Sequence, residues 1–307
     1  MVASVAPLVS VHWPLYTVFP ASAALFYALY FVGFERFSAS CLAEKYDKFS
    51  WLNKRIWRQN LCALVHTYAL VIVMIVVLAR SHAQLQTALL YPHYDVLAYC
   101  AVSFSMGYMC LTLPWSLRHY FGSETERRGT RPTLIIHHAF VVLAHLVYLL
   151  TQTSPWPGAL SLIVFEWSNL HLMPHHLMTQ WGYRGKWHVY NGVAFFLFCT
   201  FVRVIGAMVL GAFYIRDIVA FRPHAVLGAA NAAGAWVSVL LSLTAYLVIL
   251  ALSIYWYVME VLSEVHKEFK QIFGPKWYLC GCLCAAKGGA AAATYDKTAA
   301  AKTVSAV

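Results

Sequence analysis

The amino-acid sequence predicts an all-α polytopic membrane protein, a bundle of about seven transmembrane helices around a polar or lipid cavity. Of its 307 residues, 61% are hydrophobic and 11% are charged, whereas roughly 25% of the residues of an ordinary soluble domain are charged. The apolar residues gather in runs of about 20, the length that a helix needs to cross a hydrocarbon core ~30 Å thick. A soluble domain of this size would need more polar surface, so that class is excluded.

Six apolar stretches are long enough to span the bilayer as helices. The first has no basic segment before it and no clear small-residue cleavage site, so we expect a retained helix rather than a signal peptide. Pro20 within this stretch predicts a kink. The six stretches lie at about 15–34, 59–79, 96–117, 133–151, 189–213 and 233–259.

A seventh stretch, at about 158–176, is apolar up to Phe165 and then polar, beginning with Glu166. We retain it as a span, because polar residues inside a membrane bundle are expensive but are tolerated at functional sites. With this span counted, nearly all Lys and Arg residues of the loops and the tail fall on one side of the membrane. Since basic residues are enriched on the cytosolic side, we expect a lumenal N-terminus and a cytosolic C-terminus.

The chain shows no internal repeat and no second folded domain. We expect the first transmembrane helix and a lumenal N-terminus in residues 1–34, a transmembrane domain in 35–265 and a cytosolic tail in 266–307. The tail is rich in Ala, Gly and Lys, so it is expected to be disordered after about residue 287. The net charge is +10, but the basic residues form short clusters beside apolar runs, so no nucleic-acid partner is expected. The sequence does not indicate an oligomeric state.

Polar residues inside the spans predict the position of a cavity. At a rise of about 1.5 Å per residue, Glu166, Arg203 and His145 occupy one layer near the middle of the membrane. A lone charge there costs at least ~2.5–3.5 kcal/mol, which predicts that Glu166 and Arg203 pair, either as a structural clamp between two helices or as part of a functional site. We assign the rest of the cavity wall to His66, Ser168, Asn169 and Asn191.

His137 and His138 lie about one helical turn inside the cytosolic end of the fourth span. An imidazole can take up and return a proton near neutral pH, so this pair is the candidate for a general base. His138 and His145 are two helical turns apart and share a face, which favours His138 as the base and His137 as its orienting partner. A non-catalytic alternative stays open, in which both histidines lie at the membrane interface and bond to a loop or to headgroups.

The ordered set of short motifs resembles the TLC-domain family, which contains the ceramide synthases and a group of smaller TLC-domain proteins of lipid metabolism. The likeness covers roughly residues 40–265 and is closest to the small members, in which Glu-x-Ser follows the paired histidines and Asn-Gly opens the next helix. It implies a bundle of six or more helices around a central lipid cavity, in the endoplasmic reticulum. The motifs are Trp57 and His66 with eight residues between them, Gly107-Tyr108, His137-His138, Glu166-x-Ser168, and Asn191-Gly192 followed by Arg203.

In the ceramide synthases the paired histidines belong to the active site, so the resemblance assigns a catalytic role to His137 and His138. They would deprotonate an amine that attacks a fatty acyl-CoA thioester, with membrane lipids as partners, acyl-CoA as co-substrate and no bound cofactor. Two departures put ceramide synthesis itself in doubt. After Gly-Tyr, where many small members carry an Asp, this chain has Met109-Cys110-Leu111-Thr112. The predicted span at about 158–176 offers Glu166 in place of the aspartates of the ceramide synthase signature.

The resemblance therefore leaves two functions open, an acyl-CoA-dependent lipid acyltransferase and a non-catalytic lipid-binding or lipid-transport bundle of lipid homeostasis. A rival class is the membrane di-iron hydroxylases and desaturases, because His171-x-x-x-His175-His176 fits one of their histidine boxes. Such a site needs several boxes, and no second one appears, so no metal site is expected. A seven-helix receptor is supported by the helix count alone.

Three cysteines just beyond the last span predict a lipidation site. Cysteines near the membrane on the cytosolic side are frequent targets of S-palmitoylation. A metal clip is the less favoured alternative, since no fourth ligand lies nearby in the sequence. The three residues are Cys280, Cys282 and Cys284.

Overall fold

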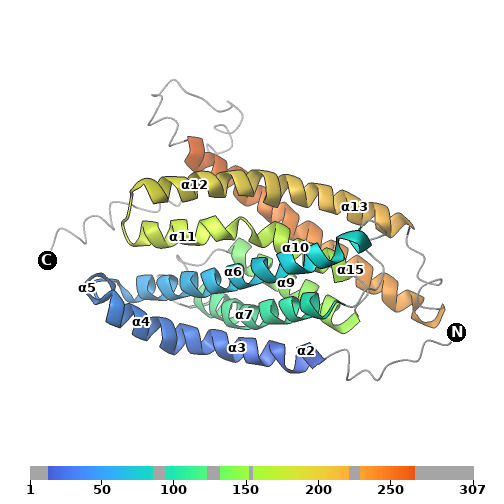
Figure 1. Cartoon of the computed structure of the whole chain (residues 1–307), viewed down its shortest axis with the longest axis horizontal. Helices are drawn as coiled ribbons and strands as arrows, with labels where there is room; N and C mark the ends of the chain where they lie inside the picture. Colours follow the sequence, from blue (N-terminus) through green and yellow to red (C-terminus); the bar gives the residue numbers. More distant parts are fainter. Residues whose placement is uncertain (1–12, 86–94, 123–131, 152–154, 221–228, 267–307) are drawn as a thin grey trace. The chain divides into compact units, whose positions relative to one another are not determined.

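The structure is a computed structural model that describes residues 13–85, 95–122, 132–151, 155–220 and 229–266. The chain divides into two compact units, residues 1–257 and 258–307, and the helix bundle described below lies in the first. Within the described residues the regular elements are all helical (Figure 1). This confirms the predicted all-α class.

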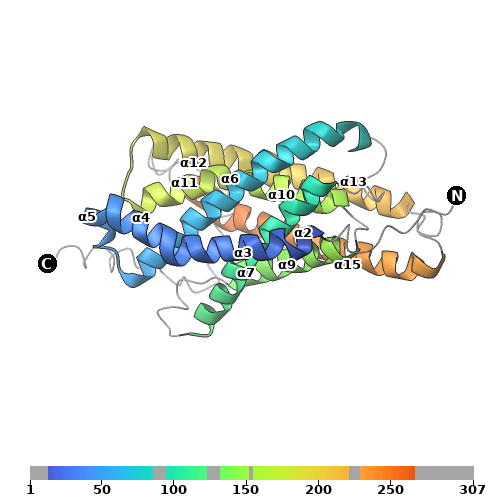
Figure 2. The same ribbon diagram turned by 60° about the horizontal axis from the view of Figure 1, so that its bottom comes forward.

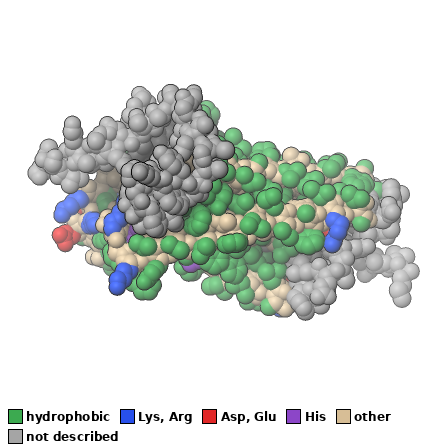
Figure 3. All heavy atoms as spheres, turned by 90° about the horizontal axis from the view of Figure 1, so that it is seen from above, with side chains coloured by type: hydrophobic (Ala, Val, Ile, Leu, Met, Phe, Trp, Pro, Cys, Tyr) green, Lys and Arg blue, Asp and Glu red, His purple; other side chains and the backbone are tan. Residues whose placement is uncertain are grey.

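In the part of the chain that the structure describes, six helices are long and apolar enough to cross a membrane, and each contains one of the predicted apolar stretches or most of it. Their outward surfaces carry large apolar side chains, such as Leu150, Phe201 and Val219, which are 62%, 61% and 78% exposed. Figure 3 shows one face of the molecule, largely hydrophobic with Lys and Arg towards its ends. Such a surface is suited to lipid, so the protein is an integral multipass membrane protein. The candidate spans are Trp13–Cys41, Trp51–Arg80, Val96–Tyr120, Pro132–Leu150, Lys186–Ala220 and Ala232–His266.

The first span is built from short helical segments rather than one regular helix. Its first break, at Thr17, lies just before Pro20, which has no N–H to bond the carbonyl four residues earlier, so the predicted irregularity is present. The segments are α2 (Trp13–Tyr16), α3 (Val18–Ala28), the π-helical η1 (Leu29–Gly33) and α4 (Phe34–Cys41); α5 (Ala43–Tyr46) follows outside the span.

The central spans are longer and more regular. Val96–Tyr120 is the most buried, with 67% of its apolar window inside the structure, because it packs against α3, α6 and α9 (Figures 1 and 2). Asp95 caps its first turn by accepting hydrogen bonds from the backbone N–H groups of Leu97 and Ala98. These helices are α6 (Trp51–Leu85), α7 (Val96–Tyr120), α9 (Pro132–Thr151) and α15 (Ala229–Trp256), which η3 (Tyr257–Val261) continues.

The predicted seventh span, at about 158–176, is not among the six candidate spans of the described residues. This part of the chain forms two consecutive helices, α10 (Pro155–Glu166) and α11 (Asn169–Gln180), of 12 residues each. They follow one another along the bundle in Figure 1. The helix is interrupted at Trp167 and Ser168, although the N–H of Trp167 still donates to the carbonyl of Ile163 at 2.9 Å. Neither helix alone reaches the length of a span, so the polar residues beginning at Glu166 lie at and beyond a helix break.

The span predicted at about 189–213 is a helix with a wider turn in its middle. It consists of α12 (Lys186–Phe198), the π-helical η2 (Cys199–Gly206) and α13 (Ala207–Ala220). π-helical turns inside α-helices are rare and are frequent at functional sites. Arg203 lies within η2 and is 7% exposed.

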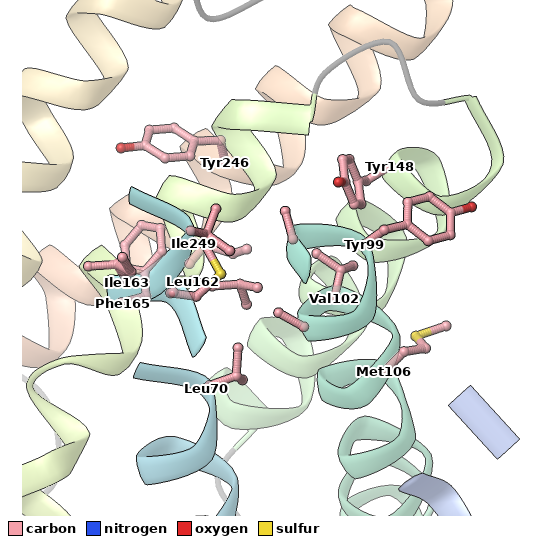
Figure 4. Close-up of a cluster of buried hydrophobic side chains, with 14 of the residues drawn as sticks. Leu70, Tyr99, Val102, Met106, Tyr148, Leu162, Ile163, Phe165, Tyr246 and Ile249 are labelled. Carbon is pink, nitrogen blue, oxygen red and sulfur yellow. The ribbon is translucent and has the colours of Figure 1, made fainter. Parts of the chain in front are cut away.

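A cluster of buried hydrophobic side chains from six helices, α6, α7, α9, α10, α13 and α15, holds the middle of the bundle together (Figure 4). Leu70 comes from α6, Tyr99 from α7, Tyr148 from α9, Phe165 from α10 and Tyr246 from α15. Because lipid is also apolar, close packing rather than water exclusion holds these helices together within the membrane.

Candidate functional site

A cavity lies between α7, α9, α10, α13 and α15, next to the hydrophobic cluster of Figure 4. Much of its wall is apolar, formed by side chains such as Val102, Leu162 and Ile249. A cavity with an apolar wall and a few polar groups is typical of a ligand site. The polar side chains on its wall are Ser105, His137, His145, Tyr148, Ser161, Glu166, Tyr214, Ser242 and Tyr246.

Glu166 ends α10, and its carboxylate lies on the cavity wall. Its Oε2 accepts hydrogen bonds from Thr67 Oγ1 and Asn169 Nδ2, each at 3.0 Å. The same oxygen lies 3.8 Å from Nδ1 of His66. Helices α6, α10 and α11 are thereby connected around one carboxylate, and these donors stabilise its charge inside the membrane.

Arg203 projects from η2 towards the break between α10 and α11. Its Nη1 donates to the Phe165 carbonyl at 3.1 Å, to Ser168 Oγ at 3.3 Å and to Asn169 Oδ1 at 3.2 Å. Its Nε donates to Ser253 Oγ at 3.3 Å. The guanidinium is therefore held by neutral acceptors, and it satisfies backbone and side-chain groups that the helix break exposes.

The expected direct ion pair between Glu166 and Arg203 is not formed among the described residues. The side chain of Asn169 lies between them, donating to the carboxylate and accepting from the guanidinium. Both charged groups do lie in one layer, as their positions along the helices predicted. The sequence could not show that an amide from the start of α11 would separate them.

His66 is 1% exposed and lies between a serine and a carboxylate. Its Nε2 is 3.0 Å from Oγ of Ser105 on α7, and its Nδ1 faces Glu166. The imidazole stacks on the ring of Tyr108, with ring centroids 4.2 Å apart and an interplanar angle of 20°. The Gly107-Tyr108 motif therefore supplies the platform that fixes the plane of the His66 ring.

The three histidines of α9 each have a buried ring nitrogen without a hydrogen-bond partner among the described residues. These atoms are Nδ1 of His137, Nδ1 of His138 and Nε2 of His145. Nδ1 of His145 is bonded to the carbonyl of Val141, which can only accept. That Nδ1 therefore carries the hydrogen, and Nε2 of the neutral ring is a proton acceptor. Buried polar atoms without partners are rare and call for an explanation, such as a bound ligand.

The two members of the histidine pair differ in whether they line the cavity. His137 and His145 are on its wall, and His138 is not among the lining residues. The His137 ring packs edge-on against Trp256 at 5.2 Å between centroids. The structure therefore places His137, not His138, beside His145 on the cavity.

Other predicted residues lie apart from the cavity wall. Asn191 on α12 donates to the carbonyl of Trp187, one turn earlier in its own helix. The ring of His175 packs against that of His188 with centroids 4.0 Å apart and planes tilted by 32°, while the ring of His171 stacks on Phe198 at 4.9 Å. Among the described residues no three His, Cys, Asp or Glu side chains are grouped so that they could hold a metal ion. The three predicted lipidation cysteines, at 280, 282 and 284, lie outside the described residues.

Sequence reasoning found Ser168 but missed three other hydroxyl side chains of the site. Thr67 and Ser105 contact the Glu166 and His66 groups, and Ser253 accepts from Arg203. Serine and threonine are common in transmembrane helices, so they carry no signal of their own. The position of Thr67 directly after His66 was the one available indication.

Fold and site together define an integral multipass membrane protein that encloses a partly polar cavity within its helices. The family model of the TLC domain matches residues 56–261, about two thirds of the chain. The chain therefore belongs to the TLC-domain family, and its role is lipid-related. No curated protein and no solved structure matches it.

Proposed function

We propose that the protein is an acyl-CoA-dependent lipid acyltransferase of the endoplasmic reticulum membrane, with a lumenal N-terminus and a cytosolic C-terminus. The observation that carries this proposal is the set of unpartnered histidine nitrogens on α9, beside a cavity within a lipid-embedded bundle. A histidine with a free, unprotonated nitrogen is suited to act as a general base. The apolar wall suits a fatty acyl chain, which has no polar group to match.

In this mechanism His137 removes a proton from the amine or hydroxyl group of an acceptor lipid. The acceptor attacks the carbonyl carbon of the acyl thioester, and a new amide or ester bond forms as the carbon–sulfur bond breaks. The proton then passes from His137 to the departing thiolate of CoA, which restores the neutral imidazole. His138 holds the neighbouring position on α9, and His145 lies deeper along the same cavity.

Burial favours this role over the alternative of interfacial histidines. His137 is 8% exposed and His145 is 5% exposed, so neither is placed to bond freely with headgroups. An unpaired buried polar group costs about 1–3 kcal/mol. Three unpaired histidine nitrogens on one helix are better explained by a bound ligand that supplies their hydrogen-bond partners.

A non-catalytic lipid-binding or lipid-transport protein is the second candidate. The apolar residues that make up much of the cavity wall favour it, because retention of a lipid chain requires nothing more. The polar network of Glu166, Asn169 and Arg203 would then be structural and would hold α6, α10, α11 and η2 together.

An acyl-transfer assay separates the two candidates. Purified protein in lipid nanodiscs is incubated with labelled acyl-CoA and a panel of amine and lysolipid acceptors. We expect labelled product from wild type, with His137→Ala slower by ~10²–10⁴-fold, as for loss of a general base. His176→Ala is the matched control, because His176 is exposed and does not line the cavity. Co-purified lipid without any labelled product, in every acceptor tested, would favour the non-catalytic candidate.

A further inference from the structure

The side chains of Ser105, His66 and Glu166 lie next to one another in the site, in the sequence of nucleophile, base and orienting carboxylate. Ser105 Oγ is 3.0 Å from Nε2 of His66. The opposite nitrogen of the same ring, Nδ1, is 3.8 Å from Glu166 Oε2. Ser105 and Glu166 both line the cavity, and His66 lies buried between them.

The tautomer of His66 follows from its two neighbours. A lone pair on Nδ1 would face the negative carboxylate of Glu166, so the neutral ring is stabilised with its hydrogen on Nδ1. Nε2 is then unprotonated and accepts the hydrogen of the Ser105 hydroxyl. This is the protonation state in which a histidine can activate a serine.

Ser105 also departs from the usual behaviour of hydroxyl residues in helices. Such side chains commonly bond the carbonyl three or four residues earlier in their own helix. Thr112, Thr200 and Thr244 do so, accepted by the carbonyls of Tyr108, Phe196 and Leu240. The Ser105 hydroxyl instead bonds His66 on a neighbouring helix.

We propose that Ser105, His66 and Glu166 form a catalytic triad in which Ser105 carries the acyl group as a covalent intermediate. The proposal rests on the proposed acyl transfer and sends the acyl group through a serine of the same cavity, in place of direct attack by the acceptor on the thioester. The triad arrangement is recognised by geometry and roles rather than by sequence order. The gap of 3.8 Å between His66 and Glu166 is longer than a hydrogen bond, and such contacts tighten when substrate binds.

The reaction takes place in two balanced steps. First, Ser105 Oγ attacks the carbonyl carbon of an acyl thioester, and its proton moves to Nε2 of His66. The carbon–sulfur bond breaks, and the thiolate leaves with that proton, so an acyl-serine ester remains. Second, the hydroxyl or amine of an acceptor lipid attacks the ester, and its proton passes through His66 to Ser105 Oγ, which regenerates the serine.

Glu166 acts through His66, so it is a positioning residue. It fixes the hydrogen of His66 on Nδ1 and stabilises the imidazolium that forms in each step. Thr67 and Asn169 in turn hold the carboxylate oxygen that faces His66. Tyr108 keeps the ring in plane.

A serine-directed covalent probe tests the nucleophile without acyl-CoA. Protein in nanodiscs is treated with a fluorophosphonate that carries a long alkyl chain, and the adduct is located by mass spectrometry of the intact chain and its peptides. We expect one adduct, on Ser105, that is lost in Ser105→Ala and forms at least ~100-fold more slowly in His66→Gln. Ser116→Ala is the matched control, because Ser116 is a buried serine on the same helix as Ser105 and does not line the cavity. It should label as wild type does.

Two further variants keep the result clear if Ser105→Ala unfolds. Ser105→Cys, incubated with labelled acyl-CoA, should hold the label as a thioester that neutral hydroxylamine releases, while the wild-type ester resists it. Glu166→Gln should slow probe labelling and change the pH dependence of its rate, which a purely structural role would not do. Absence of any adduct, or an adduct that persists in Ser105→Ala, overturns the triad.

The outcomes also separate this proposal from the proposed function. Full acyl transfer by Ser105→Ala with loss of transfer in His137→Ala would overturn the acyl-serine and leave direct transfer standing. An adduct on Ser105 in a protein that transfers no acyl group from acyl-CoA to any acceptor would support the nucleophile and overturn the acyltransferase.

Discussion

Asn169 donates a hydrogen bond from Nδ2 to Oε2 of Glu166 over 3.0 Å, across the break between α10 and α11. Its Oδ1 accepts from Arg203 at 3.2 Å. A neutral amide thus connects a carboxylate and a guanidinium that do not touch. The two charges stabilise each other through this amide, whose carbonyl and N–H ends are oriented by opposite partners.

This bridge predicts a stability effect at Asn169. Asn169→Ala removes two hydrogen bonds to charged groups, so it should lower the free energy of unfolding in detergent by about 1.5–3 kcal/mol. The coupling between Glu166→Gln and Arg203→Gln in a double-mutant cycle should be present in the wild-type background and vanish in Asn169→Ala. Asn191→Ala is the control, since Asn191 bonds only within its own helix. Equal losses for the two asparagine variants would show that Asn169 bridges nothing.

The contact between α3 and α7 predicts that Gly107 tolerates no side chain. A Cβ there would lie 1.9 Å from Ser22 Oγ and 2.6 Å from the backbone nitrogen of Ala23. The serine can rotate, but the backbone of α3 must move away, so Gly107→Ala should cost about 1–3 kcal/mol.

Gly234 provides the control for this prediction. Apart from its chain neighbours and the backbone of its own helix, no atom of the described residues lies within 4 Å of the position that a Cβ would take there. Gly234→Ala in α15 should therefore stabilise by about 0.4–1 kcal/mol, because alanine has less freedom in the unfolded chain. Thermal transitions in detergent measure both variants. A Gly107→Ala transition at or above that of wild type would contradict the close packing of α3 on α7.

The distribution of basic residues predicts the orientation of the chain. A glycosylation acceptor sequence attached to each end in turn should be modified at the N-terminus and not at the C-terminus, because glycosylation takes place in the lumen. The shift in mass on a gel, reversed by a glycosidase, measures it. A modified C-terminal tail would contradict an odd number of membrane crossings with a lumenal N-terminus.

The cysteines beyond the last span predict S-acylation of the tail. Acyl-exchange labelling of protein from cells should be strong in wild type and lost when Cys280, Cys282 and Cys284 are all changed to Ser. Cys41→Ser is the control, since Cys41 is an exposed thiol elsewhere in the chain. Labelling that the triple variant leaves unchanged would exclude lipidation of these residues.

The sequence predicted the spans well because hydropathy measures the length of chain that lipid can accept. It predicted 96–117, and α7 is Val96–Tyr120. It placed the second span at 59–79, whereas α6 begins at Trp51, since the polar first turns of this helix lie outside the apolar stretch. One of them carries Arg58, which forms an ion pair with Glu35 at 2.9 Å.

That Glu166 and Arg203 lie close together could be predicted, but their direct neighbours could not. The rise per residue put the two residues in one layer, and in the structure the side chain of Asn169 bonds both. Which side chains touch depends on the rotation of each helix, and the π-helical turn at Cys199–Gly206 alters that rotation. The pairing of His66 with Ser105 joins a histidine that the motifs marked to a serine that nothing in the sequence distinguishes, so no pattern could have shown it.

The break at Trp167 and Ser168 also affects how the chain is made. A segment of two short helices with Glu166, Asn169 and His171 along it cannot leave the translocon for lipid on its own apolarity. It must wait for partners, first α6, which offers Thr67, and then η2, which offers Arg203. Variants that weaken these contacts should therefore appear in cells first as chains in which this segment is not integrated, cleared by quality control before any loss of function can be measured.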